Sequence, residues 1–130
     1  MSVIKRIHSN LYFVKDLVKT VDFYGKLGFT VTASVPGKDG RLQFAILARD
    51  GLTLMFQDRE SLTGEYPVLG TAKTQPSATL YILVDSVAAY YENMKRDYEI
   101  LSELHKTFYG ATEFAIKDNN GYVLTFTQSY

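Results

Sequence analysis

The chain has 130 residues, of which 46% are hydrophobic and 22% charged, a composition typical of a globular protein with a core of its own. Fourteen basic and fourteen acidic residues balance, which argues against nucleic acid or an anionic membrane surface as a partner. Cysteine is absent, so disulfides, thiolate metal ligands and a cysteine nucleophile are excluded. Neither a signal peptide nor an apolar membrane span is visible, and the expected location is the cytoplasm.

The first half of the chain predicts a strand, a helix and three more strands. Residues 7–14 are apolar with polar interruptions, and Asp16 can cap a helix that ends at Gly28. Residues 29–35 have the β-branched content of a strand. Residues 41–57 predict a hairpin, because an Arg-Asp-Gly turn divides two apolar runs.

The second half repeats this order after a connector. The connector, residues 59–76, has several glycines and prolines and is long enough to cover a site. A strand is expected at 78–84 and a helix at about 87–98. Residues 99–108 predict a short irregular strand and a loop, and residues 112–128 a second hairpin.

An internal repeat organises the whole chain. Phe44, Gly51 and Phe56 recur as Phe114, Gly121 and Phe126, roughly 70 positions later. We therefore predict one α+β domain, residues 1–130, made of two tandem βαβββ units at about 1–58 and 77–130. Together the units would form a curved mixed sheet around a concave cleft.

Strand alternation predicts which side chains face that cleft. The side chains predicted to lie in the core, under the helices, are Leu42, Phe44, Ile46, Leu52, Leu54, Phe56, Phe114, Ile116, Tyr122, Leu124 and Phe126. The side chains predicted to face the cleft are Gln43, Ala45, Thr53, Met55, Glu113, Ala115, Val123, Thr125 and Thr127. This second set mixes small, polar and sulfur-containing groups, which is typical of a small-molecule pocket, although an ordinary solvent-facing sheet has a similar composition.

Two distant motifs resemble those of a known family. The opening motif is Asn10-Leu11-Tyr12-Phe13-Val14-Lys15-Asp16-Leu17, followed by Phe23-Tyr24 and Leu27-Gly28-Phe29. The closing motif is Glu113-Phe114-Ala115-Ile116-Lys117-Asp118 with Asn120-Gly121-Tyr122-Val123-Leu124. Both are similar to motifs of the glyoxalase, bleomycin-resistance and extradiol-dioxygenase superfamily, whose fold is called vicinal oxygen chelate. The resemblance implies this fold and a homodimer in which units pair between chains, although the two units of one chain could also pair with each other.

In metal-using members of that superfamily, His, Gln or Glu side chains on the concave face hold a divalent ion. The resemblance places the four ligand positions on Ser9, Met55, Thr79 and Thr125. Hydroxyl groups are poor metal ligands, and a thioether binds soft ions rather than the divalent ions that this family uses. We therefore expect no metal and no cofactor. His8, through a bulge, or His105, from a loop, could still serve a displaced metal site.

The candidate ligand-binding residues lie mainly on the predicted concave face. They are Ser9, Phe13, Gln43, Met55, Thr79, Tyr81, Tyr109, Glu113 and Thr125. Glu113 could anchor a cationic or hydroxylated ligand or act as a base, or it could form a salt bridge with Arg41 or Lys117. Phe13 and Tyr81 offer rings for stacking, and Tyr109 is either a wall of the pocket or a rim aromatic.

Three functions remain open at this point. The first is a metal-free protein that sequesters a small organic ligand, as the resemblance to bleomycin-resistance proteins implies. The second is a glyoxalase-like lyase, isomerase or dioxygenase with a displaced metal or none. The third is a module that binds another protein on the concave face. No catalytic residue is identified in any of them.

Overall fold

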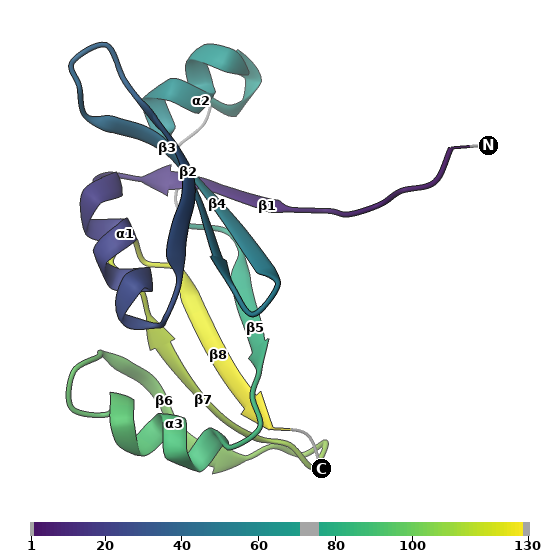
Figure 1. Ribbon diagram of the computed structural model, residues 1–130. Helices are drawn as coiled ribbons and strands as arrows, with labels where there is room; N and C mark the ends of the chain where they lie inside the picture. Colours follow the sequence, from purple (N-terminus) through teal and green to yellow (C-terminus); the bar gives the residue numbers. More distant parts are fainter. Residues whose placement is uncertain (1, 71–75, 129–130) are drawn as a thin grey trace. The chain divides into compact units, whose positions relative to one another are not determined.

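A computed structural model of the chain describes residues 2–70 and 76–128 (Figure 1). The chain falls into two compact units, Met1–Gln75 and Pro76–Tyr130. Each unit has the predicted βαβββ order, with one four-stranded mixed sheet, so the α+β class and the tandem repeat are confirmed. None of the helices in the described ranges is long and apolar enough to cross a membrane.

The first unit contains the elements that the sequence predicts. These are β1 (Ser9–Val14), α1 (Leu17–Lys26), β2 (Thr30–Pro36), β3 (Leu42–Arg49) and β4 (Leu52–Asp58). The strand order is β1-β4-β3-β2, with β1 parallel to β4 and the other pairs antiparallel. A parallel β1–β4 pair needs a crossover connection, and α1 supplies part of it.

Helix α1 forms because its cap and its apolar positions agree. Asp16 Oδ1 accepts a hydrogen bond from the Lys19 backbone N–H at 3.1 Å, as expected for an N-cap. Tyr24 is fully buried, and its ring centroid lies 4.7 Å from that of Phe56 on β4. This contact shows which face of the sheet α1 covers.

Part of the predicted connector is helical. Helix α2 (Arg59–Glu65) is capped by Asp58, whose Oδ1 accepts from the Ser61 N–H at 3.2 Å, and a 3₁₀ helix, η1 (Pro67–Gly70), follows. Only Leu62 of α2 is buried, so the helix lacks the apolar periodicity that would predict it from sequence. Residues 71–75 of the connector lie outside the described part of the chain.

The second unit repeats the plan with β5 (Thr79–Leu83), α3 (Val87–Met94), β6 (Ile100–Lys106), β7 (Thr112–Lys117) and β8 (Val123–Gln128). The order β5-β8-β7-β6 is equivalent to that of the first unit. Tyr90 stacks on Phe126 at 5.7 Å and Tyr91 contacts Phe114 at 5.3 Å, which identifies the face that α3 covers. The helix ends at Met94, four residues earlier than predicted. The stretch predicted as irregular contains a seven-residue strand, β6, whose pairing with β7 shifts register twice.

The two β-hairpins differ in register, which corrects one prediction. In the second unit Phe114 pairs with Phe126, whereas in the first unit Ala45, not Phe44, pairs with Phe56. Directly paired residues share a face, so Ala45 lies under α1 and Phe44 on the opposite face.

The whole of β3 is therefore turned over relative to the prediction. Gln43 and Ala45, predicted for the cleft, are on the α1 side, whereas Leu42, Phe44 and Ile46, predicted for the core, are on the other side. The turns explain the difference. Asp50-Gly51 is a two-residue turn with φ of 52° and 77°, whereas five residues, 118–122, connect β7 to β8.

A second correction concerns the start of β1. Ser9 pairs with Leu54 and Leu11 with Phe56, so Ser9 shares the face of α1 rather than that of Met55. Asn10, the partner of Met55, occupies the face predicted for Ser9. A register shift between Leu11 and Val14 lets both of these residues be buried.

Candidate ligand-binding site

The second unit brings five of the predicted residues to one face of its sheet. Tyr81 pairs with Thr125, and Glu113 pairs with Thr127, on the face opposite α3. Thr79, two residues before Tyr81 on β5, points to the same face of the sheet. The predicted alternation is thus confirmed for β5, β7 and β8.

Glu113 is the centre of a hydrogen-bonded group on this face. The Tyr81 hydroxyl donates to Glu113 Oε2 and lies 3.2 Å from Thr127 Oγ1. The Tyr109 hydroxyl, which comes from the loop between β6 and β7, donates to the same Oε2 at 2.7 Å. We call these four residues the Glu113 cluster. Glu113 is 6% exposed and Thr127 1%, so the polar centre of the cluster is buried.

These contacts keep Glu113 ionised. Burial acts to raise the pKa of Glu113, but the hydrogen bonds from Tyr81, Tyr109 and Thr127 together outweigh it, and the pKa is lowered from its ordinary value of 4.5. The pKa of Tyr109 is raised to about 12, mainly by its hydrogen bond to this carboxylate and secondarily by burial. At neutral pH the cluster is therefore a carboxylate surrounded by neutral hydroxyl donors.

No lysine or arginine neutralises this carboxylate in the described part of the chain. The predicted alternative, a salt bridge from Arg41 or Lys117, is wrong, because Arg41 pairs with Asp39 at 2.7 Å and Lys117 with Glu99 at 3.5 Å. A histidine, His105, pairs with Glu113 across β6 and β7 and is exposed. Its attraction contributes to the low pKa of Glu113 but is the weakest of the causes.

Two tyrosine rings are held near the carboxylate, and a phenylalanine ring contacts one of them. Tyr81 is 60% exposed and Tyr109 46%, although both hydroxyls are bonded at the cluster. Phe108 is fully exposed and packs edge-on against Tyr109 at 5.0 Å. Exposed apolar rings that are fixed at one end are unusual on a surface without a partner and are typical of a binding site.

Sequence reasoning placed Thr127 on this face without assigning it a role, and it did not single out Phe108. Thr127 could have been chosen from its strand phase, since it lies two residues after Thr125. The signal for Phe108 is the pair of neighbouring aromatic residues before Gly110, in a loop at the predicted rim.

The predicted residues of the first unit form no comparable group. Met55 lies on the face opposite α1 with Asn10 and Gln57, and Asn10 Nδ2 donates to Gln57 Oε1 at 2.9 Å. Gln57 Nε2 in turn donates to Ser61 Oγ at 3.0 Å. Phe13 is part of β1, but its side chain lies outside what the structure describes.

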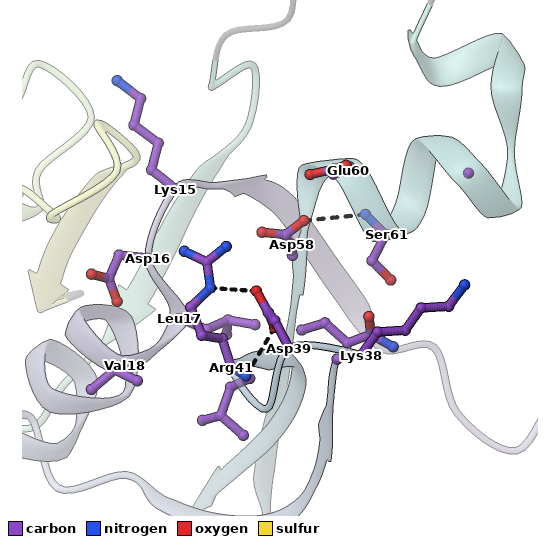
Figure 2. A pocket seen from close by; sticks show the side chains of 14 residues that line it. Lys15, Asp16, Leu17, Val18, Lys38, Asp39, Arg41, Asp58, Glu60 and Ser61 are labelled. Carbon is purple, nitrogen blue, oxygen red and sulfur yellow. Dashed lines mark hydrogen bonds and ion pairs between the residues drawn. The ribbon is translucent and has the colours of Figure 1, made fainter.

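Gln43 lines a separate pocket of about 920 Å³ in the first unit. Figure 2 shows this pocket, which lies between the start of α1, the β2–β3 loop and the start of α2. The three aspartates that line it already have structural partners: Asp39 binds Arg41, while Asp16 and Asp58 cap helices. We therefore take the Glu113 cluster, rather than this pocket, as the candidate site.

The family's metal positions do not fit a metal in this chain. Ser9, Met55, Thr79 and Thr125 offer hydroxyl and thioether donors, and Ser9 is on the wrong face of its sheet. Within residues 2–70 and 76–128, no three His, Asp or Glu side chains are grouped as metal ligands. His8 is exposed in the segment before β1, and His105 Nδ1 lies 2.7 Å from the Glu103 carbonyl oxygen.

Comparison with known proteins identifies the family. A family model described as the Glyoxalase/Bleomycin resistance protein/Dioxygenase superfamily matches residues 6–126. The chain belongs to this superfamily. No curated protein is significantly similar in sequence.

Several solved structures resemble the chain over nearly its full length. TioX from Micromonospora sp. ML1 is 20% identical with a TM-score of 0.76, covering 97% of this chain and 99% of that one. A glyoxalase/bleomycin resistance protein/dioxygenase from Nocardioides is 20% identical with a TM-score of 0.79, covering 99% and 86%. A glyoxalase-related enzyme from Fulvimarina pelagi is 18% identical with a TM-score of 0.76, covering 97% and 89%. At these identities the similarity establishes the fold and leaves function to be argued from the site.

Proposed function

We propose that this member of the glyoxalase superfamily is a small-molecule-binding protein, which holds an organic ligand against the Glu113 cluster without using a metal. The observation that carries the proposal is a buried, ionised carboxylate that has no lysine or arginine partner in the described chain and is bordered by exposed aromatic rings. Buried charges in proteins are normally paired, so a site of this kind favours a ligand that completes it.

Each member of the cluster has a distinct part in binding. Glu113 supplies the charge and the hydrogen-bond acceptor. Tyr81 and Tyr109 hold that carboxylate in place through their hydroxyls and offer their ring faces to the ligand. Because these bonds exist before a ligand arrives, little ordering is needed on binding.

The same geometry favours binding over acid–base catalysis. A general base works best when its pKa lies near the working pH, whereas the pKa of Glu113 is lowered below 4.5. The pKa of Tyr109 is about 12, too high for an efficient general acid at neutral pH. Sequestration without chemistry is therefore the function that we propose. On the family resemblance, we extend the proposal to a homodimer, and we propose the cytoplasm as its location.

A thermal-shift screen tests the proposed function. Purified chain is heated with a library of drug-like and metabolite-like organic molecules, and separately with Mn, Fe, Co, Ni and Zn salts. Because a ligand that binds the native state raises the unfolding temperature, we expect hits among organic molecules and none among the salts. Hits should weaken in Glu113→Gln and persist in Glu99→Gln, which removes the same charge from an exposed ion pair at the other end of β7.

Other outcomes would point elsewhere. Stoichiometric metal in the purified protein would contradict metal-free binding and favour the glyoxalase-like enzyme. Organic ligands that bind Glu113→Gln as tightly as the natural chain would place the site away from the cluster. Light scattering of the purified chain tests the homodimer, and a monomer at micromolar concentration would contradict it.

A further inference from the structure

We infer that the ligand of the Glu113 cluster is a planar organic cation, such as an aromatic ring system with a quaternary nitrogen. This inference rests on the proposed function and names the chemical class of the ligand. It comes from three features of the face: its unbalanced charge, its exposed rings and the small side chains beside them.

The charge of the face determines the sign of the ligand. Glu113 is 6% exposed, and its hydrogen-bond donors, Tyr81, Tyr109 and Thr127, are neutral hydroxyls. His105 pairs with Glu113 across β6 and β7, but it is exposed and contributes least to the low pKa of Glu113. The lysine on the same strand, Lys117, is paired with Glu99 instead. The ionised carboxylate would repel an anionic ligand and attract a cation.

The aromatic rings favour an organic cation over a small hydrated ion. Tyr81, Phe108 and Tyr109 are respectively 60%, 101% and 46% exposed, so their rings are open to a ligand. The faces of such rings attract cations, most strongly when water is excluded. Because both tyrosine hydroxyls are fixed on Glu113, the rings are held close to the same negative charge.

The residues beside Tyr81 favour a flat ligand. Ala115 and Thr125 pair across β7 and β8, on the face of Glu113 and next to Tyr81 in register. Both have short side chains, and Ala115 is only 7% exposed, so half-buried Thr125 is the part of this low surface that a ligand can reach. A planar body can lie on this surface while its positive charge faces the carboxylate.

Matched probes test the inference on the natural chain. N-methylquinolinium is a permanent planar cation, quinoline is its neutral counterpart at pH 8, and 2-naphthoate is an anion of similar size. Their binding is measured by fluorescence titration, and the chain contains no tryptophan to interfere. We expect N-methylquinolinium to bind at least about tenfold more tightly than quinoline, a difference of about 1.4 kcal/mol, and 2-naphthoate to bind weakest.

Variants distinguish the contribution of the charge to binding from that of the rings. Glu113→Gln should reduce the preference for N-methylquinolinium over quinoline by about tenfold, while Glu99→Gln should leave it unchanged. Tyr81→Leu, which removes a ring but no charge, should weaken both N-methylquinolinium and quinoline. Thermal unfolding of each variant shows whether it is folded, and the probe comparison on the natural chain needs no variant at all.

The outcomes distinguish failure of the inference from failure of the proposed function. Equal binding of N-methylquinolinium and quinoline, or tighter binding of 2-naphthoate, would overturn the cation class but keep a ligand-binding face. A preference that survives in Glu113→Gln would also overturn it. If no probe binds up to about 1 mM and no organic molecule raises the unfolding temperature, both the inference and the proposed function are wrong.

Discussion

The turned-over register of β3 makes a sharp prediction about two neighbouring residues. Ala45 is fully buried under α1, whereas Phe44, next to it, lies half-buried on the opposite face. We compare Ala45→Asp with Phe44→Asp. The repeat alone, in which Phe44 corresponds to the buried Phe114, predicts that Phe44→Asp is the more damaging of the two.

The structure predicts the reverse order. A carboxylate at a fully buried position has its pKa raised by about 3–5 units, which corresponds to about 4–7 kcal/mol of lost stability at neutral pH. This loss is comparable with the whole stability of many domains. Phe44→Asp removes only part of the burial energy of a phenylalanine, about 1–2 kcal/mol, because the new carboxylate can reach water.

Urea unfolding followed by circular dichroism measures both costs. With a slope of about 1–3 kcal/mol per molar urea, Phe44→Asp should lower the midpoint by about 0.3–2 M. At the same slope, Ala45→Asp should lower it several times further or leave no folded protein at zero urea. Ala45→Ser serves as a control, because it changes the size of the side chain little and adds no charge. A larger loss for Phe44→Asp than for Ala45→Asp would refute the register.

Three further predictions concern stability and pH. Gly51→Ala should cost about 1–2 kcal/mol in urea unfolding, because φ at Gly51 is 77°, whereas Gly64→Ala in α2 should be neutral or stabilising; equal effects would contradict the turn geometry. Asp16→Ala should cost about 1 kcal/mol through the lost cap of α1, and an unchanged midpoint would argue against that cap. Tyr81, Tyr109 and His105 face Glu113, and its pKa in the folded chain is below 4.5. The contribution of Glu113 to stability is therefore present above pH 4.5 and is lost as the pH falls through the folded pKa. Thermal unfolding temperatures measured against pH should show this loss in the natural chain and not in Glu113→Gln; parallel curves would contradict it.

The sequence predicts the order of elements well because local signals and the repeat agree. The cap at Asp16, the turn at Gly51 and the apolar alternation of residues 112–128 each specify one kind of structure. Helix α2 escapes prediction because it is short and buries only Leu62, so its sequence has no apolar period to detect.

Strand register could not be predicted from the repeat. The spacing from Phe44 to Gly51 equals that from Phe114 to Gly121, yet the first hairpin closes with two loop residues and the second with five. One residue of register turns a strand over, so similar sequences place opposite side chains in the core. Pairing in β1 adds a shift of its own after Leu11.

The candidate site is predicted in part for the same reason. Alternation alone places Tyr81 and Glu113 on one face, because β5, β7 and β8 follow the expected phase. The hydrogen bond from Tyr109 depends on the path of the loop between β6 and β7, which strand periodicity does not specify. Alternation in the first unit puts Ser9 and Gln43 on the wrong face, so the sequence overestimates how many candidate residues lie on the face opposite the helix.

Nuclear magnetic resonance of chain labelled with ¹³C-tyrosine, titrated with N-methylquinolinium, tests ligand binding at the Glu113 cluster most directly. Ring signals are assigned by Tyr81→Phe and Tyr109→Phe. We expect the Tyr81 and Tyr109 signals to shift together, with one affinity, and to require about tenfold more N-methylquinolinium for the same shift in Glu113→Gln. Shifts confined to other tyrosines, or none at saturation of a confirmed ligand, would contradict the assignment of the site.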